Sequence, residues 1–307
     1  PVHIDISAQD ARAESRPPAP WESPRLPDTD PETIETAIKR IADAKRPVMV
    51  VGLQCRAADR AAAAKQLANS LRGPVLTTYK AKGVFAEAEP SNIGLYTGAK
   101  LDNTVLAEAD LLIFCGVDPV EMIPGNWTHT ARAIVISETS GLSWPFSADS
   151  ILVGSVSKIA DLLSRQPSGS EWSGEDLATH RSRLRDSVTN QAATGRSPDD
   201  IVDAVANAAP QNARLTVDAG AHMFSAMTRW PANRPHDVLK SNGLSTMGYA
   251  VPAALASCLQ EPNRPTIALT GDGGMMMSLA ELSTAARLEA NITVVVMNDA
   301  ALSLIDI

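Results

Sequence analysis

The sequence predicts an α/β fold made of two doubly wound parallel-sheet domains. Short, continuous apolar runs such as 111–115 and 293–297 alternate with helical segments along most of the 307 residues. Strands that are apolar on both faces and separated by helices are typical of a parallel sheet covered on both sides. The length leaves room for about two domains, and the 44% hydrophobic content is enough for two cores.

The first domain is expected over 31–165. A polar, proline-rich segment over 8–30 precedes it and is typical of an extended linker. Asp30 and Pro31 predict a helix start, as N-cap and first helical residue, and this helix ends before Pro47. The expected elements after it are strand 48–51, helix 57–70, strand 74–78, helix 102–108, strands 111–115, 133–136 and 151–153, and a closing helix.

A second domain is expected over 185–307, after a linker over 166–184. The linker prediction rests on the glycines, serines and proline between residues 166 and 174. The expected strands of the second domain are 214–218, 266–270 and 293–297, and its helices are 199–208, 222–229, 247–259 and 278–289. We expect the three consecutive methionines at 275–277 to pack in its core.

Composition excludes several partners. The 27 basic and 35 acidic residues give a net charge of -8 without a basic cluster, so neither nucleic acid nor an anionic membrane is expected to bind. No apolar run is long enough to cross a bilayer. Cys55, Cys115 and Cys258 lie in apolar surroundings, and we expect free thiols in a reducing, cytoplasmic compartment.

Two carboxylates follow neighbouring strands of the second domain. Asp272 lies in a Gly271-Asp272-Gly273-Gly274 turn, and Asp299 follows strand 293–297. Because the carboxyl ends of adjacent parallel strands face one crevice, both side chains can approach one cation. Magnesium prefers such oxygen ligands and leaves positions for a diphosphate, which the glycine backbone can approach closely. Taken alone, the turn is also explained by a plain strand-to-helix bend in which Asp272 caps the helix.

Two further segments, taken together with this turn, resemble the motifs of a known family. They are 217–222, Val-Asp-Ala-Gly-Ala-His, and 242–254, which contains Gly-Leu-Ser-Thr-Met-Gly. Taken alone, His222 is typical of a surface or helix-start histidine, and Met247 of a core residue. Together with the Gly271–Gly274 turn, the segments resemble the diphosphate-binding domain of thiamine-diphosphate-dependent enzymes, in the branch that contains acetolactate synthase. By this resemblance 31–165 is the central domain, 185–307 is most of the diphosphate-binding domain, and 1–30 is the end of a pyrimidine-binding domain plus a linker.

The resemblance also implies roles for residues. Asp272, Asp299 and the carbonyl of Ala301 would bind Mg²⁺, although relatives most often have Asn and Gly at the last two positions. Gly273 and Gly274 would donate N–H groups to the diphosphate, and Gly220, Ala221 and His222 would hold its other end. Met247 would support the V shape of thiamine, while Ser245 would accept a hydrogen bond from its pyrimidine edge.

The implied reaction is decarboxylation of a pyruvate-like 2-oxo acid. Leu304 and Ile305 would line the reacting carbon, where simple decarboxylases often have a Glu in place of Ile305. An apolar side chain cannot protonate the enamine, which favours carboligation of the acetolactate synthase type. The alternatives are an oxidase, a decarboxylase, an acyl-CoA lyase, or a non-catalytic diphosphate-binding fragment.

No catalytic residue is expected within these 307 residues. The activating Glu of the family lies in the pyrimidine-binding domain of another subunit, so we expect a homodimer or homotetramer and an inactive isolated chain. Relatives hold FAD or nothing in the central domain. Because 52–56 and 116–121 lack a Gly-x-Gly-x-x-Gly turn, the sequence favours tight turns there over an FAD site.

Overall fold

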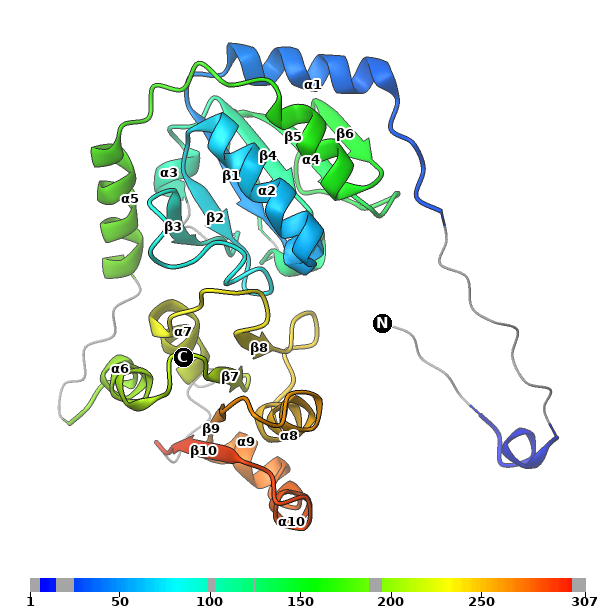
Figure 1. Cartoon of the computed structure of the whole chain (residues 1–307), viewed down its shortest axis with the longest axis vertical. Helices are drawn as coiled ribbons and strands as arrows, with labels where there is room; N and C mark the ends of the chain where they lie inside the picture. The colour runs from blue at the N-terminus through cyan, green and yellow to red at the C-terminus, as the bar shows by residue number, and fades with distance from the viewer. Residues whose placement is uncertain (1–5, 15–24, 99–102, 124, 188–194, 300–307) are drawn as a thin grey trace.

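The chain folds into two α/β domains, each built on a sheet in which every strand pairing is parallel (Figure 1). The computed structural model describes residues 6–14, 25–98, 103–123, 125–187 and 195–299. Helices cover both faces of each sheet, so the predicted fold class is confirmed.

The first sheet has six strands in the order β3-β2-β1-β4-β5-β6. This is the strand order of a Rossmann fold, whose order reverses beside the first strand. The strands are β1 (Pro47–Val51), β2 (Val75–Thr77), β3 (Asn92–Leu95), β4 (Leu111–Cys115), β5 (Arg132–Ser137) and β6 (Ser150–Val153). The helices are α1 (Pro31–Asp43), α2 (Ala58–Leu71), α3 (Asn103–Leu106), α4 (Val156–Ser164) and α5 (Gly174–Ser187), with short 3₁₀ turns at Asp10–Arg12, Leu53–Arg56 and Pro119–Glu121.

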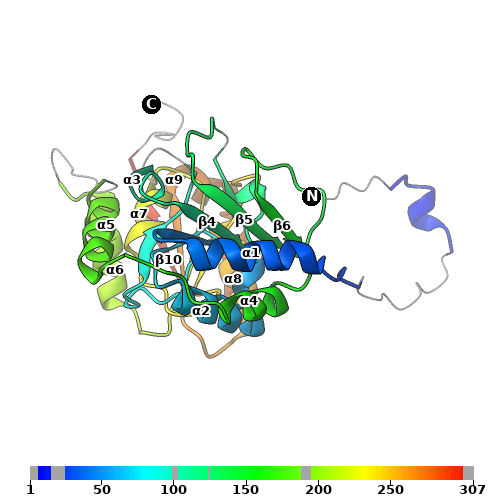
Figure 2. The ribbon, with the colours of Figure 1, turned by 90° about the horizontal axis from the view of Figure 1, so that it is seen from above.

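Alternate residues of these strands enter two different cores. On β1, Met49 and Val51 pack against α1, α2 and α4, whereas Val48 and Val50 face the side covered by α3 and α5. Seen from above in Figure 2, α2 and α4 lie next to each other on one side of β4, β5 and β6. The period of two in a strand explains why a continuous apolar run is required here.

The second sheet has four strands in the order β10-β9-β7-β8. They are β7 (Arg214–Val217), β8 (Val238–Lys240), β9 (Thr266–Gly271) and β10 (Ile292–Met297). The helices α6 (Pro198–Ala208) and α7 (His222–Arg229) pack on one face, and α8 (Ala250–Gln260) and α9 (Asp272–Met277) pack on the other. A last helix, α10 (Glu281–Arg287), follows α9.

Several predicted elements need correction. Strands β3 and β8 were not predicted, because they are short edge strands containing Asn and Gly or ending in Lys, residues that are depleted in strands. Within the segment 166–184 assigned to the linker, α5 begins at Gly174, and its Leu184 is buried in the core of the first domain. The helix expected over 278–289 is confined to α10. Met276 and Met277 are exposed instead of packed in a core.

The predicted start of the first helix is confirmed. The N-cap at Asp30 accepts a hydrogen bond from Thr33 N at 2.9 Å, and α1 begins at Pro31. All three cysteines are free thiols, with Sγ of Cys55 3.7 Å from Sγ of Cys115. Among the described residues, no helix is long and apolar enough to cross a membrane.

The two domains contact each other around β2 and β8. Tyr79 and Leu95 of the first domain pack against the core of the second. Lys240 lies with its Nζ 5.1 Å from the centre of the Tyr79 ring. Gly83 has no room for a side chain, because an added Cβ would lie 2.2 Å from the carbonyl oxygen of Arg234. Close backbone contact therefore fixes one domain against the other.

Burial of Lys240 in this interface predicts a pH-dependent stability. Loss of hydration, reinforced by the nearby Lys80, lowers the pKa of Lys240 to about 8. The unfolded chain keeps a pKa near about 10.4 for this group and binds more protons between the two values, so the free energy of unfolding rises with pH across that window. At pH 7 the burial costs about 3 kcal/mol.

The test is Lys240→Met, which removes the charge and keeps an apolar side chain of similar length. The Lys240 amine donates hydrogen bonds to the Ser241 carbonyl oxygen and to Asn242 Oδ1, and the variant loses both. Because this loss offsets part of the relief, we expect urea unfolding to show a gain of roughly 1–3 kcal/mol at pH 7. The variant should lose the increase in stability that the wild type shows between about pH 8 and pH 10. A variant that is less stable at pH 7 and keeps this slope would refute the assignment.

Candidate functional site

A cavity of about 430 Å³ lies at the carboxyl ends of β7, β9 and β10. All the predicted cofactor residues within the described part of the chain line it: Gly220, Ala221, His222, Ser245, Met247, Gly271, Asp272, Gly273, Gly274 and Asp299. Ala301, Leu304 and Ile305 lie outside the described residues. The three sequence segments thus meet at one place, as the parallel topology requires.

The two carboxylates enter this cavity from adjacent strands. Met297 of β10 pairs with Gly271 of β9, so Asp272 follows one strand directly and Asp299 follows the other by two residues. No group of three or more His, Cys, Asp or Glu side chains is placed for a metal among the described residues. A magnesium ion held here would therefore complete its shell with backbone, water or phosphate oxygens, which is its usual behaviour.

Asp218 organises the cavity, although its sequence position gave no sign of this role. Its Oδ1 accepts hydrogen bonds from the backbone N of Tyr249 at 2.6 Å and of Ala250 at 3.1 Å. Its Oδ2 accepts from Gly248 N at 2.9 Å and from Thr270 Oγ1 at 2.7 Å. This fully buried carboxylate ties the end of β7 to the start of α8 and the end of β9.

The carboxylate of Asp218 leaves room only for glycine at position 274. An added Cβ there would lie 2.0 Å from Oδ2 of Asp218 and 2.7 Å from Oγ1 of Thr270. Neither atom can retreat, because each is held by the hydrogen bond between them. The glycine therefore allows the Gly271–Gly274 turn to lie against the start of α8.

His222 is the titratable group between the carboxylates and the glycines. Burial lowers its pKa, while the charges of Asp218 and Asp299 act in the opposite direction. Its ring packs against two glycines, since an added Cβ would lie 2.5 Å from Cε1 at Gly220 and 3.4 Å at Gly271. Nε2 is buried, and no described residue forms a hydrogen bond with it. A buried ring nitrogen without a partner fits a polar ligand in the cavity.

A strained loop brings Ser245 and Met247 to the cavity. Ser245 has a left-handed backbone with φ of 45°, and Gly243 and Gly248 have φ of 85° and 74°. Thr246 N donates to Ser241 Oγ at 3.3 Å across the loop. Non-glycine residues in this conformation cluster at functional sites. The proposed contacts of these two residues with thiamine stay predictions.

Further lining residues had no clear sequence signal. Arg196, Pro198 and Ile201 come from the start of α6, and Asn298 lies between the two strand-end residues Met297 and Asp299. The helix start at Ser197-Pro198 was readable, since Ser197 caps α6 and pairs reciprocally with Asp200. The fold of the whole domain decides that the start of α6 lines the same cavity as Asp272.

The strand ends of the first domain are filled by their own loops. The buried Glu121 carboxylate accepts hydrogen bonds from Leu53 N, Asp118 N and Thr78 Oγ1, and burial raises its pKa. A Cβ at Gly52 would lie 2.2 Å from Cα of Val117. These are the contacts of tight strand-to-helix turns. The sequence favoured such turns over an FAD site, and these contacts do not test whether FAD binds.

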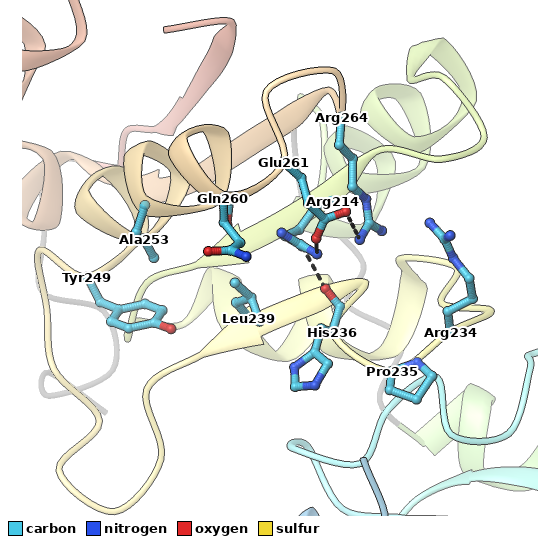
Figure 3. Close-up of a pocket in the computed structure, with 12 residues that line it drawn as sticks. Arg214, Arg234, Pro235, His236, Leu239, Tyr249, Ala253, Gln260, Glu261 and Arg264 are labelled. Atoms are coloured by element: carbon cyan, nitrogen blue, oxygen red, sulfur yellow. Dashed lines mark hydrogen bonds and ion pairs between the residues drawn. The ribbon is translucent and has the colours of Figure 1, made fainter. Parts of the chain in front are cut away.

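A more open cavity of about 680 Å³ adjoins α8 and β8 (Figure 3). Its buried arginines are neutralised within the wall: Arg214 pairs with Glu261, and Arg264 pairs with both Glu261 and Asp237. Arg214 also donates to the carbonyl oxygen of His236 at 2.8 Å. The paired charges stabilise the end of α8 and leave the cavity near Asp272 as the candidate site.

Comparison with known proteins matches each of the two domains to a family model. Residues 34–160 match the family model "Thiamine pyrophosphate enzyme, central domain", and residues 218–307 match "Thiamine pyrophosphate enzyme, C-terminal TPP binding domain". The large subunit of acetolactate synthase isozyme 1 from Escherichia coli is 31% identical over 99% of this chain and 56% of its own length. Acetolactate synthase from Bacillus subtilis is 25% identical over 92% of this chain and 52% of its length. The chain therefore spans about half the length of the curated relatives that it matches.

Proposed function

The chain belongs to the thiamine pyrophosphate enzymes, of which it holds the central domain and the C-terminal TPP-binding domain. From this premise we propose that the intact protein uses thiamine diphosphate and Mg²⁺ to decarboxylate a pyruvate-like 2-oxo acid and to join the product to a second carbonyl compound. The observation that carries the proposal is the cavity that gathers Asp272, Asp299, His222 and Met247.

The donor set of this cavity fits the cofactor. Asp272 and Asp299 offer hard oxygen ligands for Mg²⁺, with the carbonyl of Ala301 as a proposed third. Gly273 and Gly274 bring backbone N–H groups to the wall, and the unpartnered Nε2 of His222 offers a further polar contact for a diphosphate. The groups that line the cavity thus match a magnesium diphosphate in charge and in hydrogen bonding.

The remaining residues of the cavity would position the cofactor. Thiamine diphosphate, when bound, supplies the electron sink for loss of carbon dioxide from a 2-oxo acid. Met247 would press against its rings from the strained loop, and Ser245 would fix its pyrimidine edge. Val296 and Ile201 add apolar surface to the wall. In this proposal the protein binds, orients and desolvates, and the cofactor carries the chemistry.

Two observations support carboligation over plain decarboxylation. The relatives from E. coli and B. subtilis are named acetolactate synthases. Ile305 stands where a proton donor would be needed, and its side chain has no proton to give. We further propose that the site is completed by a second subunit, which analytical ultracentrifugation of the intact protein would test by showing a dimer or tetramer.

The direct test is incubation of the intact protein with pyruvate, thiamine diphosphate and Mg²⁺. We expect acetolactate to form, with one carbon dioxide released for each two pyruvates consumed. Release of carbon dioxide with free acetaldehyde as the only other product would contradict carboligation and leave the family assignment intact. No turnover of any 2-oxo acid, with full cofactor occupancy, would contradict the catalytic proposal.

A prediction for Met247 tests the positioning role. Met247→Leu keeps a large apolar side chain, so we expect activity within about threefold of wild type, because volume-conserving apolar changes are tolerated. Met247→Ala removes the support. We expect kcat to fall by about 10–100-fold, because a misplacement of reacting groups by about 1 Å lowers the rate by that order. Steady-state kinetics at saturating cofactor separates this loss from weaker binding. Equal activity of the two variants would show that Met247 does not position the cofactor.

A further inference from the structure

A separate cavity of about 380 Å³ lies between the two domains. The first domain contributes side chains from β2, β3 and α5, and the second contributes the last turns of α7 and Pro231. None of its lining residues also lines the cavity near Asp272. Its volume is within the range of small-molecule sites, which are often found between domains.

Much of the wall of this cavity is apolar. Ile93 of β3 and Met227 of α7 are almost fully buried, and Leu184 of α5 is 8% exposed. Phe224 of α7 also lines the cavity and is 38% exposed, so apolar surface is available there. Gly94 of β3 leaves space there, since an added Cβ would meet only Leu184, at 3.7 Å.

Arg181 places an uncompensated positive charge on the same wall. Its Nη2 donates to the carbonyl oxygens of Glu89 at 2.6 Å and Pro90 at 3.0 Å. Its Nε is buried and has no hydrogen-bond partner among the residues that the structure describes. Within the described part of the chain, it makes no ion pair. By contrast, the lining cations Lys82 and Arg229 pair with Glu87 and Asp203. Arg181 therefore keeps both charge and a donor for a ligand.

We propose that this cavity binds a small amphipathic anion. Its carboxylate or sulfonate would pair with Arg181, because a guanidinium binds such groups through paired N–H donors. Its apolar body would lie on Ile93, Leu184, Met227 and Phe224, where burial of apolar surface adds to affinity. Arg185, one turn further along α5, also lines the cavity.

Helix α7 connects this cavity to the candidate cofactor site. Its first residue, His222, lines the site near Asp272, whereas Phe224, Met227 and Thr228 line the interdomain cavity. One rigid helix about 12 Å long thus has a ligand site at each end. A ligand that shifts α7 would change the affinity for thiamine diphosphate, and the cofactor would change the affinity for the ligand by the same factor. This coupling rests on the proposed function, whereas the binding itself does not.

The test uses 8-anilinonaphthalene-1-sulfonate as a fluorescent amphipathic anion, titrated into the intact protein with and without saturating thiamine diphosphate and Mg²⁺. Arg181→Gln should weaken probe binding about 10-fold or more, as loss of a charge-assisted hydrogen bond does. The matched control, Arg183→Gln, changes an exposed arginine of the same helix that does not line the cavity, and should leave binding unchanged. Phe224→Ala should weaken it about threefold or more by removing exposed apolar surface.

Competition identifies the ligand class. Octanoate should displace the probe, and octanol at the same concentration should not, because only the former carries the anion that Arg181 needs. Equal effects of the Arg181 and Arg183 substitutions, or equal displacement by octanol, would overturn the proposal. A failure of thiamine diphosphate to bind would instead count against the proposed function, since the titration without cofactor still reports on this cavity.

Discussion

Replacing Asp218 by alanine is expected to abolish binding of thiamine diphosphate and to destabilise the second domain by about 3–5 kcal/mol. The substitution leaves three backbone N–H groups of residues 248–250 without an acceptor, each at a cost of about 1–3 kcal/mol, part of which relaxation recovers. The start of α8 would then separate from β7, and the loop that carries Ser245 and Met247 would lose its position. Urea unfolding and calorimetric titration with the cofactor measure the two effects.

A graded control separates this role from general damage. Thr270→Val keeps the side-chain shape and removes the fourth hydrogen bond to Asp218, together with the 3.1 Å contact of the same hydroxyl with the Gly271 carbonyl oxygen. Its expected cost is about 1 kcal/mol, with cofactor binding retained. If the alanine variant at Asp218 were as stable as the valine variant at Thr270 and bound the cofactor equally well, the organising role of Asp218 would be wrong.

The second large effect is expected at the carboxylate pair. Asp272→Asn should weaken magnesium-dependent cofactor binding at least about 100-fold, because loss of groups that merely support metal ligands already costs 10–100-fold. Asp299→Asn should weaken it by less than about 10-fold, because relatives most often have Asn at this position, so the site there is expected to bind Mg²⁺ through an amide oxygen. Both substitutions conserve size, so a difference between them reports on ligand chemistry.

The measurement for this pair is cofactor titration at several magnesium concentrations. The asparagine variant at Asp272 should need more magnesium to reach half occupancy, and the variant at Asp299 should follow the wild type. Equal losses at the two positions would mean that they contribute equally to the metal. An unchanged affinity at Asp272 would place the metal elsewhere.

The sequence predicted most of the sheet and the carboxylate pair for the same physical reason. Buried parallel strands need continuous apolar runs, and residues that follow such runs must meet at one edge of the sheet. Asp272 and Asp299 could be paired on that basis from the sequence alone. The edge strands β3 and β8 were missed because strands of three or four residues have too few apolar positions to form a pattern.

Other features depend on tertiary contacts that no local pattern encodes. Asp218 follows a strand just as Asp272 does, yet its carboxylate turns inward to bind the backbone of residues 248–250. Leu184 and Arg181 lie on a polar helix within or beside a stretch expected to be a linker, and only the fold brings them against β3 and α7. The exposed Met276 and Met277 show the same limit, since burial depends on neighbours distant in sequence.

The most direct test of the proposed cofactor site is isothermal titration of the intact protein with thiamine diphosphate, in Mg²⁺ and in EDTA. We predict one binding site per chain, strong only with the metal, and its loss in the Asp272→Asn variant. Binding that ignores both the metal and the substitution would contradict the proposed site, as would the absence of binding to the wild type.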